Sequence, residues 1–218
     1  MEPDDVLQAY QENQEEIESR LEEFRELGEE DNQRVFRELV FVILSSRSAA
    51  KNAWKAATEL ESRGLLHAEK EDIAESLAEH EIQYELDKAS YIIENRKKLS
   101  QPTLKDPRPR LKLKQRIDAE NPGKTRDWMA GNLDGVGWKA ASHFMRNTGH
   151  GKDFAIISSH IASSMYELGL RDTRSSPSDR EDYMEAEEKL KNFSDDIDIE
   201  LEALDLVLWS MRTGEVFR

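Results

Sequence analysis

The sequence predicts an all-α protein, and two observations lead to this prediction. Apolar residues recur at helical spacing along most of the 218-residue chain. No stretch alternates between apolar and polar residues for long enough to form a useful β-strand, and no internal repeat is present. A chain of this length can bury one good core or two small lobes that share a groove.

The first hundred residues are expected to form five helices. A long acidic helix ends at Gly28 and has an apolar face made of Val6, Tyr10, Ile17, Leu21 and Phe24. Residues 32–46 are apolar enough to form a core helix. Residues 48–60 follow, with Ser48 as the expected N-cap. Two further helices are expected at 72–81 and 86–100.

The second half begins with a basic connector and returns to helices. Residues 101–114 hold three prolines and five Lys or Arg, which indicates an extended segment. Either Ser178 or Asp179 is expected to cap the helix that begins at Arg180, after the 173–180 loop. The helices expected in this half span 124–132, 138–147, 158–170, 180–193 and 199–214.

The composition excludes several kinds of site. The chain has no cysteine, so disulfides, zinc–thiolate sites and iron–sulfur clusters are ruled out. Its five histidines show no metal-ligand spacing, and we expect neither a metal nor a cofactor. The longest apolar run, residues 39–44, is far too short to cross a membrane, and no signal peptide precedes it. These features predict a soluble, cytoplasmic protein.

The charge is unevenly distributed along the chain. The net charge of −15 argues against a nucleic acid partner. Residues 94–152, however, hold 14 Lys and Arg and only 6 Asp and Glu. A basic segment within an acidic surface can bind phosphates while the rest of the protein stays hydrated. Chance clustering on a solvated surface would give the same count, so the charge alone leaves DNA binding open.

The turn at 133–137 lies between two expected helices. Gly135 and Gly137 can adopt positive φ and let another backbone come close. The N–H groups around Gly135, Val136 and Gly137, together with the N-terminus of the next helix, form a natural nest for a phosphate. Such a nest binds a nucleic acid backbone without reading its sequence. A purely structural turn has the same pattern.

Lys139 is expected at the second or third position of the helix that follows this turn. The positive end of the helix dipole disfavours the ammonium form and lowers the pKa of the amine, and partial burial acts in the same direction. A neutral amine is a nucleophile that can form a Schiff base. The alternative is an ordinary exposed lysine.

Four motifs, in order, resemble those of one known family. They are ELVFVILSSRSAAKNAW (38–54), KASYIIENRK (88–97), GVGWKAASHFMRNTG (135–149) and LDLVLWSMRTGEVFR (204–218). From about Asn32 to the C-terminus, the chain resembles the archaeal-type, second-class 8-oxoguanine DNA glycosylases. These enzymes belong to the helix-hairpin-helix DNA glycosylase/AP-lyase superfamily.

The resemblance implies a base-excision repair enzyme. Residues 32–218 would form a glycosylase-like domain of two helical lobes that flank a DNA-binding cleft, with a helix-hairpin-helix motif at 125–147. Residues 1–31 precede this domain and are expected to form an acidic N-terminal helix. The damaged nucleotide would turn out of the duplex into a pocket between the lobes. Lys139 matches the catalytic lysine, which would attack the sugar C1′, expel the oxidised guanine and hold a Schiff base before β-elimination.

The resemblance also suggests residues that contact the DNA and the base. Arg47 stands where relatives place a side chain that fills the gap left by the flipped base, although a surface arginine is the alternative. His160 is retained from the family's A-I-x-D-R-H-I stretch and is expected to bind DNA. Trp209 and Arg218 fall in the region of the base pocket, although Trp209 is equally suited to a core. The family usually ends in lysine, so Arg218 keeps the charge and alters its geometry.

One position departs from the family's pattern. The stretch FAIISSHIASS (154–164) places Ser158 where relatives carry an aspartate that stabilises positive charge on the sugar. A serine hydroxyl can cap a helix but supplies no negative charge, and such electrostatic effects are worth about 3 kcal/mol or more. A lyase-only enzyme, or a non-catalytic homologue that binds damaged DNA, is therefore the alternative. Asp153 in a shifted loop is a further source of a carboxylate.

The expected partner is double-stranded DNA that contains oxidised guanine or abasic sites. No membrane contact is expected, and association with the nucleoid would follow from DNA binding. Nothing in the apolar pattern requires a second copy of the chain, so we expect a monomer.

Overall fold

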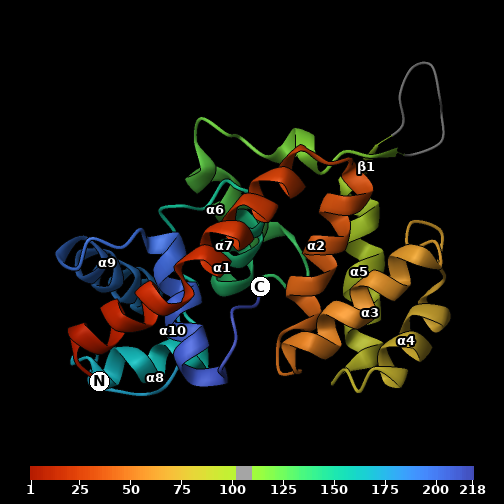
Figure 1. Ribbon diagram of the computed structural model, residues 1–218. Coiled ribbons are helices and arrows are strands. Elements are labelled where there is room, and N and C mark those ends of the chain that lie inside the picture. Colours follow the sequence, from red (N-terminus) through yellow and green to blue (C-terminus); the bar gives the residue numbers. More distant parts are fainter. Residues whose placement is uncertain (102–109) are drawn as a thin grey trace. The chain divides into compact units, whose positions relative to one another are not determined.

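The computed structural model describes residues 1–101 and 110–218 and confirms the all-α prediction (Figure 1). The α-helices in the described residues are α1 (Pro3–Glu29), α2 (Asn32–Leu44), α3 (Ala50–Ser62), α4 (Lys70–Glu79), α5 (Glu85–Leu99), α6 (Pro122–Asn132), α7 (Trp138–Asn147), α8 (Ser159–Glu167), α9 (Arg180–Asp196) and α10 (Leu201–Thr213). The chain divides into two compact units, Glu29–Phe144 and Met1–Gly28 with Met145–Arg218. The DNA-binding cleft expected between two lobes stays a prediction.

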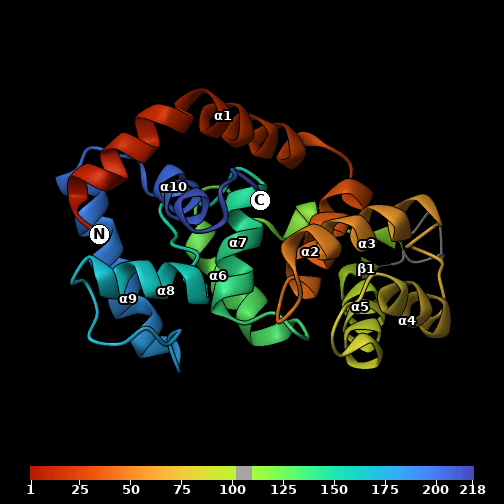
Figure 2. The same ribbon diagram turned by 60° about the horizontal axis from the view of Figure 1, so that its bottom comes forward.

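The core of the 29–144 unit is built around α2. Asp31 caps this helix by accepting hydrogen bonds from the backbone N–H groups of Gln33 and Arg34. Every residue from Val35 to Leu44 is buried, as expected for a core helix. Helix α2 packs against α3 and α5, and α4 packs against the same two helices (Figure 2).

The expected cap at Ser48 is wrong. Ala49 holds the N-cap position of α3 and makes no side-chain capping bond. The Ser48 hydroxyl instead accepts hydrogen bonds from the backbone N–H of Gln83 and from Lys88 Nζ. These distant partners engage the hydroxyl, so the helix starts later than the local sequence predicts.

The basic connector contributes a short sheet to the same unit. Strand β1 (Ser100–Gln101) pairs antiparallel with β2 (Arg110–Leu111). A 3-10 turn, η1 (Lys114–Arg116), follows. Each strand has two residues, which is too short to leave an alternating pattern in the sequence. The rest of the expected extended segment, residues 102–109, lies outside the described residues.

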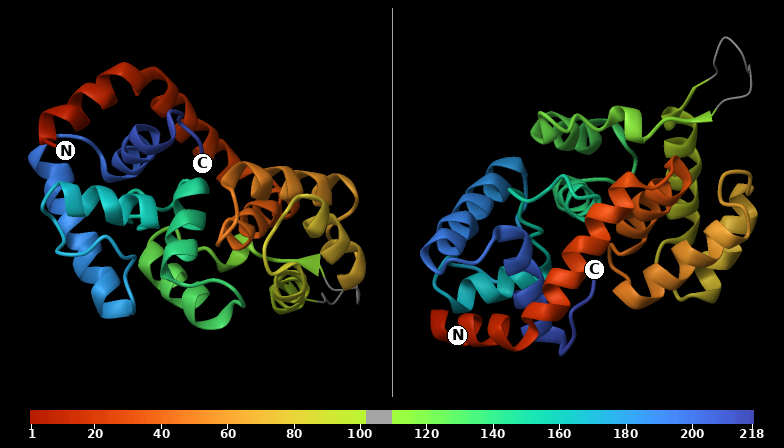
Figure 3. Two further views of the ribbon diagram at one scale, coloured as in Figure 1. Left: turned by 90° about the horizontal axis from the view of Figure 1, so that it is seen from below. Right: turned by 45° about the horizontal axis from the view of Figure 1, so that its top comes forward.

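The other unit combines α1 with α8, α9 and α10. The predicted apolar face of α1 is largely confirmed, since Val6, Ile17, Leu21 and Phe24 are buried and Tyr10 is half-buried. Helix α10 packs against α8 and α9. The long ribbon of α1 can be followed in both views of Figure 3, and Arg25 on it forms an ion pair with Glu202 of α10 at 2.8 Å.

The start of α9 follows the expected capping chemistry. Asp179 is the residue that caps α9, and its side chain accepts a hydrogen bond from the N–H of Asp182. Hydrogen bonds from the Asp182 backbone and the Ser178 hydroxyl lower the pKa of the Asp179 carboxyl. No helix among the described residues has the length and apolar character that a membrane span requires.

Candidate functional site

The predicted helix–turn–helix at 125–147 is present. Helix α6 ends at Asn132 and α7 begins at Trp138, which leaves residues 133–137 as the turn. Gly135 has φ +73°, whereas Gly137 does not adopt positive φ. Both glycines are exposed, and Val136 between them is buried. One of the two glycines is therefore required by the backbone conformation.

One face of α5 holds the turn in place. The Asn95 side chain donates to the carbonyl of Asp134 and accepts from its N–H, both at 2.8 Å. Lys98 Nζ donates to the carbonyl of Asn132 and to the Asp134 carboxylate. A Cβ added to Gly135 would lie 2.6 Å from Tyr91 Cδ2. The side chain of Tyr91 therefore leaves room only for glycine at this point of the turn.

Lys139 is half-buried at the second position of α7, and it lies close to a second lysine. Burial and the positive charge of Lys139 lower the pKa of Lys88 to about 8. Lys88 Nζ donates hydrogen bonds to Leu44 O at 3.0 Å, Ser46 O at 2.6 Å and Ser48 Oγ at 3.2 Å. The Lys88 side chain is thus held by three oxygen atoms, and its positive charge and that of Lys139 repel each other.

A pocket of about 360 Å³ adjoins the turn within this unit. It is lined by Ile43, Ser46, Arg47, Tyr84, Asp87, Lys88, Tyr91 and Gly135. Arg47 is exposed with φ +57°, and its guanidinium lies 5.9 Å from the centre of the exposed Tyr84 ring. The structure therefore brings two of the predicted DNA-binding residues, Arg47 and Gly135, to the same pocket.

Ser158, His160, Trp209 and Arg218 belong to the other unit. Ser158 is the N-cap of α8, and its Oγ accepts a hydrogen bond from the N–H of Ile161 at 3.3 Å. Asp153 forms an ion pair with Lys191 Nζ at 3.7 Å and is exposed. This position of Asp153 gives no support to the shifted loop that would bring a carboxylate to Ser158.

Helix α9 holds the segment that leads to Ser158. The Tyr183 hydroxyl donates to the carbonyl of Ala155 at 2.6 Å. Glu187 accepts from the N–H of the same residue at 2.9 Å. Since both side chains come from α9 and are buried, the backbone before α8 has a fixed course.

A predicted DNA-binding residue, His160, contacts a predicted base-pocket residue, Trp209. The His160 and Trp209 rings meet edge to face with their centres 5.0 Å apart. The indole N–H of Trp209 is buried without a hydrogen-bond partner in the part of the chain that the structure describes. A buried donor of this kind calls for an explanation, and a ligand is one. Arg218 lies over the Phe24 ring of α1 at 5.2 Å.

The sequence analysis missed the residues of α5 that position the turn. Lys88, Tyr91, Asn95 and Lys98 are three, four and three residues apart, so they form one stripe of the helix. The motif 88–97 was noticed for its resemblance alone. The signal that could have identified this stripe is the helical spacing of its polar and aromatic residues. Such a stripe can bond to a glycine turn that lies far away in the sequence.

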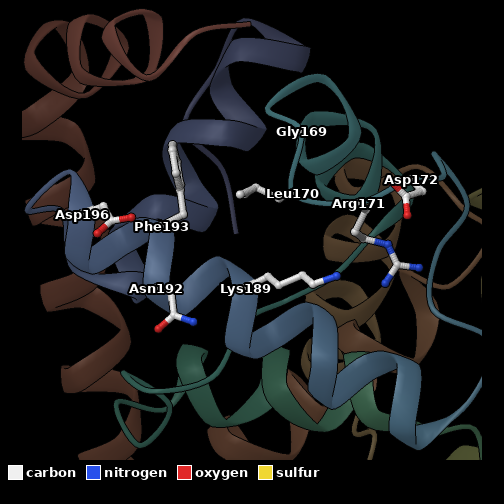
Figure 4. A pocket seen from close by; sticks show the side chains of 8 residues that line it. All are labelled: Gly169, Leu170, Arg171, Asp172, Lys189, Asn192, Phe193 and Asp196. Carbon is white, nitrogen blue, oxygen red and sulfur yellow. The ribbon is translucent and has the colours of Figure 1, made fainter.

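A second pocket, of about 350 Å³, lies in the other unit between the 169–172 segment and α9 (Figure 4). It has mixed charges, and none of the predicted site residues line it. The guanidinium of Arg171 is held there by Asp182, with nitrogen–oxygen distances of 2.7 and 3.3 Å. This pairing also lowers the pKa of the Asp182 carboxyl.

The chain is similar in sequence to known 8-oxoguanine DNA glycosylases. A family model described as 8-oxoguanine DNA glycosylase matches residues 17–199. An 8-oxoguanine DNA glycosylase/AP lyase of Fusobacterium nucleatum subsp. nucleatum is 31% identical over 217 residues, which cover 98% of this chain and 96% of that protein.

Two solved structures have a similar fold. The 8-oxoguanine DNA glycosylase of Thermotoga maritima has a TM-score of 0.86 and 31% identity, and the match covers 99% of this chain and 98% of that one. The Methanocaldococcus jannaschii 8-oxoguanine glycosylase/lyase, solved with a 15mer DNA containing 8-oxoguanine, has a TM-score of 0.84 and 28% identity. That match covers 98% of this chain and 99% of the other.

Proposed function

Since the chain belongs to the 8-oxoguanine DNA glycosylase family, we propose that it is a DNA glycosylase with AP-lyase activity that removes 8-oxoguanine from duplex DNA. The observation that carries this proposal is the position of Lys139. This amine is half-buried at the start of α7, directly after the glycine turn. This place is the positive end of the helix dipole. Residues 32–218 would form the glycosylase-like domain.

The proposed reaction uses the Lys139 amine as a nucleophile. Its nitrogen attacks C1′ of the damaged nucleotide, the bond to the base breaks, and the base leaves with the electron pair and takes up a proton. The sugar ring opens to give a Schiff base. Loss of a proton from C2′ then expels the 3′ phosphate and nicks the strand, after which water releases the enzyme.

Other residues would bind the DNA around this amine. The exposed Gly135 and Gly137 of the turn and the N-terminus of α7 offer backbone N–H groups to a phosphate. Arg47 presents an exposed guanidinium that can stack in a gap in the duplex. Trp209 offers a ring and an unpaired N–H to the base, which supports its role in the base pocket. His160 and Arg218 are proposed as further contacts with the DNA and the base.

A lyase-only enzyme is the second candidate, and Ser158 favours it. Its hydroxyl caps α8 and supplies no negative charge to a sugar that becomes positive. At an abasic site no base has to be expelled, so the Lys139 amine can form the Schiff base without that help. This candidate predicts reaction with abasic DNA and none with 8-oxoguanine DNA.

Trapping with borohydride tests both candidates. The protein is incubated with a duplex that contains one 8-oxoguanine or one abasic site, and borohydride is then added to reduce any Schiff base to a stable adduct. We expect an adduct with both duplexes, and we expect Lys139→Gln to form none. Lys97→Gln is the matched control, because it removes an exposed lysine that pairs with Glu94 on its own helix.

The two duplexes separate the possible results. An adduct on the abasic duplex alone establishes the lyase-only enzyme. The absence of an adduct on either duplex, with binding retained, would show a non-catalytic DNA-binding protein. An adduct that persists in Lys139→Gln would exclude Lys139 as the nucleophile.

A further inference from the structure

The turn after α2 holds Arg47 in a backbone conformation that arginine rarely adopts. Its φ is +57°, in the left-handed region, where a side chain with a Cβ is strained. Arg47 is also exposed, so burial of its side chain does not offset this strain. Such a conformation persists only where the surrounding structure holds it in place.

Lys88 reaches this turn from α5, and it is buried, with 4% of the residue exposed. Its Nζ donates hydrogen bonds to Leu44 O at 3.0 Å, Ser46 O at 2.6 Å and Ser48 Oγ at 3.2 Å. Three acceptors match the three N–H groups of an ammonium ion. Two of these acceptors belong to the residues on either side of Arg47 in the sequence. Lys88 therefore fixes the turn both before and after the strained residue.

The remaining acceptor is the end of α2. Leu44 is the last residue of that helix, and the last four carbonyls of a helix have no partner within it. Leu44 is also buried, so a donor from the protein takes the place of water. Lys88 thus fixes the point at which the chain leaves α2 and enters the turn.

Ser48 joins the turn to the segment before α5. Its hydroxyl accepts a hydrogen bond from the backbone N–H of Gln83 at 3.1 Å as well as the one from Lys88. The next residue, Tyr84, also has a left-handed backbone, with φ +61°, and its ring centre lies 5.9 Å from the Arg47 guanidinium. Two strained residues therefore lie side by side, and Ser48 and Lys88 connect the segments that carry them.

The Arg47 guanidinium itself is not held by a polar group. Within residues 1–101 and 110–218 it has no hydrogen bond or ion pair, although Asp87 lines the same pocket. The backbone of Arg47 is thus fixed while its charged group stays available. An arginine in this state is suited to a partner outside the protein chain, such as a nucleic acid.

We propose that Lys88 is a positioning residue for Arg47, and that it holds the turn in the conformation that presents the guanidinium to the gap in the duplex. This inference rests on the proposed function, in which Arg47 stacks in that gap. Lys88 is buried and acts through the turn, so it needs no contact with DNA.

Binding to a stable abasic-site analogue tests this role separately from the Lys139 reaction. A tetrahydrofuran residue leaves the space of the missing base and lacks the C1′ hydroxyl, so no Schiff base can form. Fluorescence anisotropy gives the Kd for this duplex and for an intact duplex of the same sequence. Their ratio is the preference for the abasic duplex. A smaller folded fraction weakens both apparent affinities equally and leaves the ratio unchanged.

The variants form a double-mutant cycle. Arg47→Ala should lower the preference about tenfold, the effect of losing one stacking contact with the bases. Lys88→Met removes the three hydrogen bonds and keeps an unbranched chain, and it should lower the preference about three- to tenfold, since it acts through Arg47. In the Arg47→Ala protein, Lys88→Met should have no further effect. Lys97→Met, which removes an exposed lysine paired with Glu94, is the control and should keep the wild-type preference.

Three results would overturn the proposal. The first is a wild-type preference in folded Lys88→Met, and the second is a wild-type preference in Arg47→Ala. The third is a double variant whose loss equals the product of the two single losses, because Lys88 and Arg47 would then act independently.

A second variant covers the case in which Lys88→Met does not fold, as judged by circular dichroism. Ser48→Ala removes one acceptor and leaves the lysine in place, and the same three results then decide. We expect Ser48→Ala to lower the preference in the wild type and to have no effect in Arg47→Ala. Ser62→Ala is its control, because the Ser62 hydroxyl bonds to a carbonyl of its own helix.

Trapping with borohydride separates this failure from that of the proposed function. If the wild type forms no adduct that depends on Lys139, the proposed function fails. If the wild type forms that adduct and any of the three results is found, only the role of Lys88 fails.

Discussion

At the scale of single residues, Ser158 satisfies a structural need at the start of α8. Its hydroxyl caps α8, which an aspartate at the same position would also do, because both are good N-cap residues. Capping of α8 therefore does not require a charged side chain at position 158. An exchange between serine and aspartate changes the electrostatics of the site while the helix start is preserved.

Ser158→Asp is expected to raise the rate of 8-oxoguanine removal. A carboxylate that stabilises positive charge on the sugar is worth about 3 kcal/mol, which corresponds to roughly a hundredfold in rate. The rate on abasic DNA should change much less, because no base has to leave. Single-turnover cleavage of the two duplexes measures both effects.

Ser158→Asn is the matched control for this change. Asparagine also caps a helix well but carries no charge, so both rates should stay at the wild-type level. Equal gains for Asp and Asn, or no gain for Asp in a folded protein, would show that a missing carboxylate does not limit the reaction.

At the scale of elements, the turn between α6 and α7 depends on α5. The Asn95 side chain forms hydrogen bonds with both the N–H and the carbonyl of Asp134. The Tyr91 ring fills the space beside Gly135. The turn is therefore part of the packed 29–144 unit. Its backbone N–H groups stay in place because α5 holds the turn from one side.

Gly135→Ala is expected to destabilise this arrangement. The new Cβ would lie 2.6 Å from Tyr91, and φ of +73° is unfavourable for alanine. The free energy of unfolding should fall by about 1–3 kcal/mol, measured by urea denaturation. Affinity for duplex DNA should fall as well.

Gly131→Ala provides the comparison for Gly135. This glycine lies in α6, has no atom within 4 Å of an added Cβ and does not adopt positive φ. Alanine there should leave stability unchanged or raise it by about 0.5–1 kcal/mol. If both variants lose stability equally, the fit between Gly135 and Tyr91 is not what constrains the turn.

The sequence predicts elements better than the contacts between them. The helices and the glycine turn follow from local patterns, and α2 is buried as its apolar residues indicate. The Ser48 cap was predicted wrongly and the anchoring of Lys88 was not predicted, both for one physical reason. Their partners lie about 35 to 44 residues away in the chain, so no local pattern records them. The roles of the site residues came from the resemblance, and their assignment to the reaction stays a prediction.

At the scale of the whole molecule, the net charge of −15 conceals the basic segment at 94–152. Within its described part, some cations already have structural partners. Lys114 Nζ donates to the carbonyls of Glu29 and Glu30, and Lys98 pairs with Asp134. Lys124, at the start of α6, is exposed. Exposed lysines of this kind are the ones available to phosphates.

Binding to duplex DNA should therefore weaken steeply as salt increases. Each phosphate contact adds about 0.9 to the slope of log affinity against log salt concentration. Lys124→Gln should reduce the magnitude of that slope by about one, as measured by fluorescence anisotropy at several salt concentrations. Lys189→Gln, on α9 and paired with Glu185, should leave it unchanged. Binding that does not depend on salt would exclude phosphate contacts by the basic segment.

Peptide mapping of the borohydride-reduced adduct tests the central claim most directly. The protein is trapped on abasic DNA, digested with nuclease and protease, and analysed by mass spectrometry to find the lysine that carries the sugar remnant. The account predicts that the modified residue is Lys139. A remnant on Lys88 or on any other lysine would contradict it.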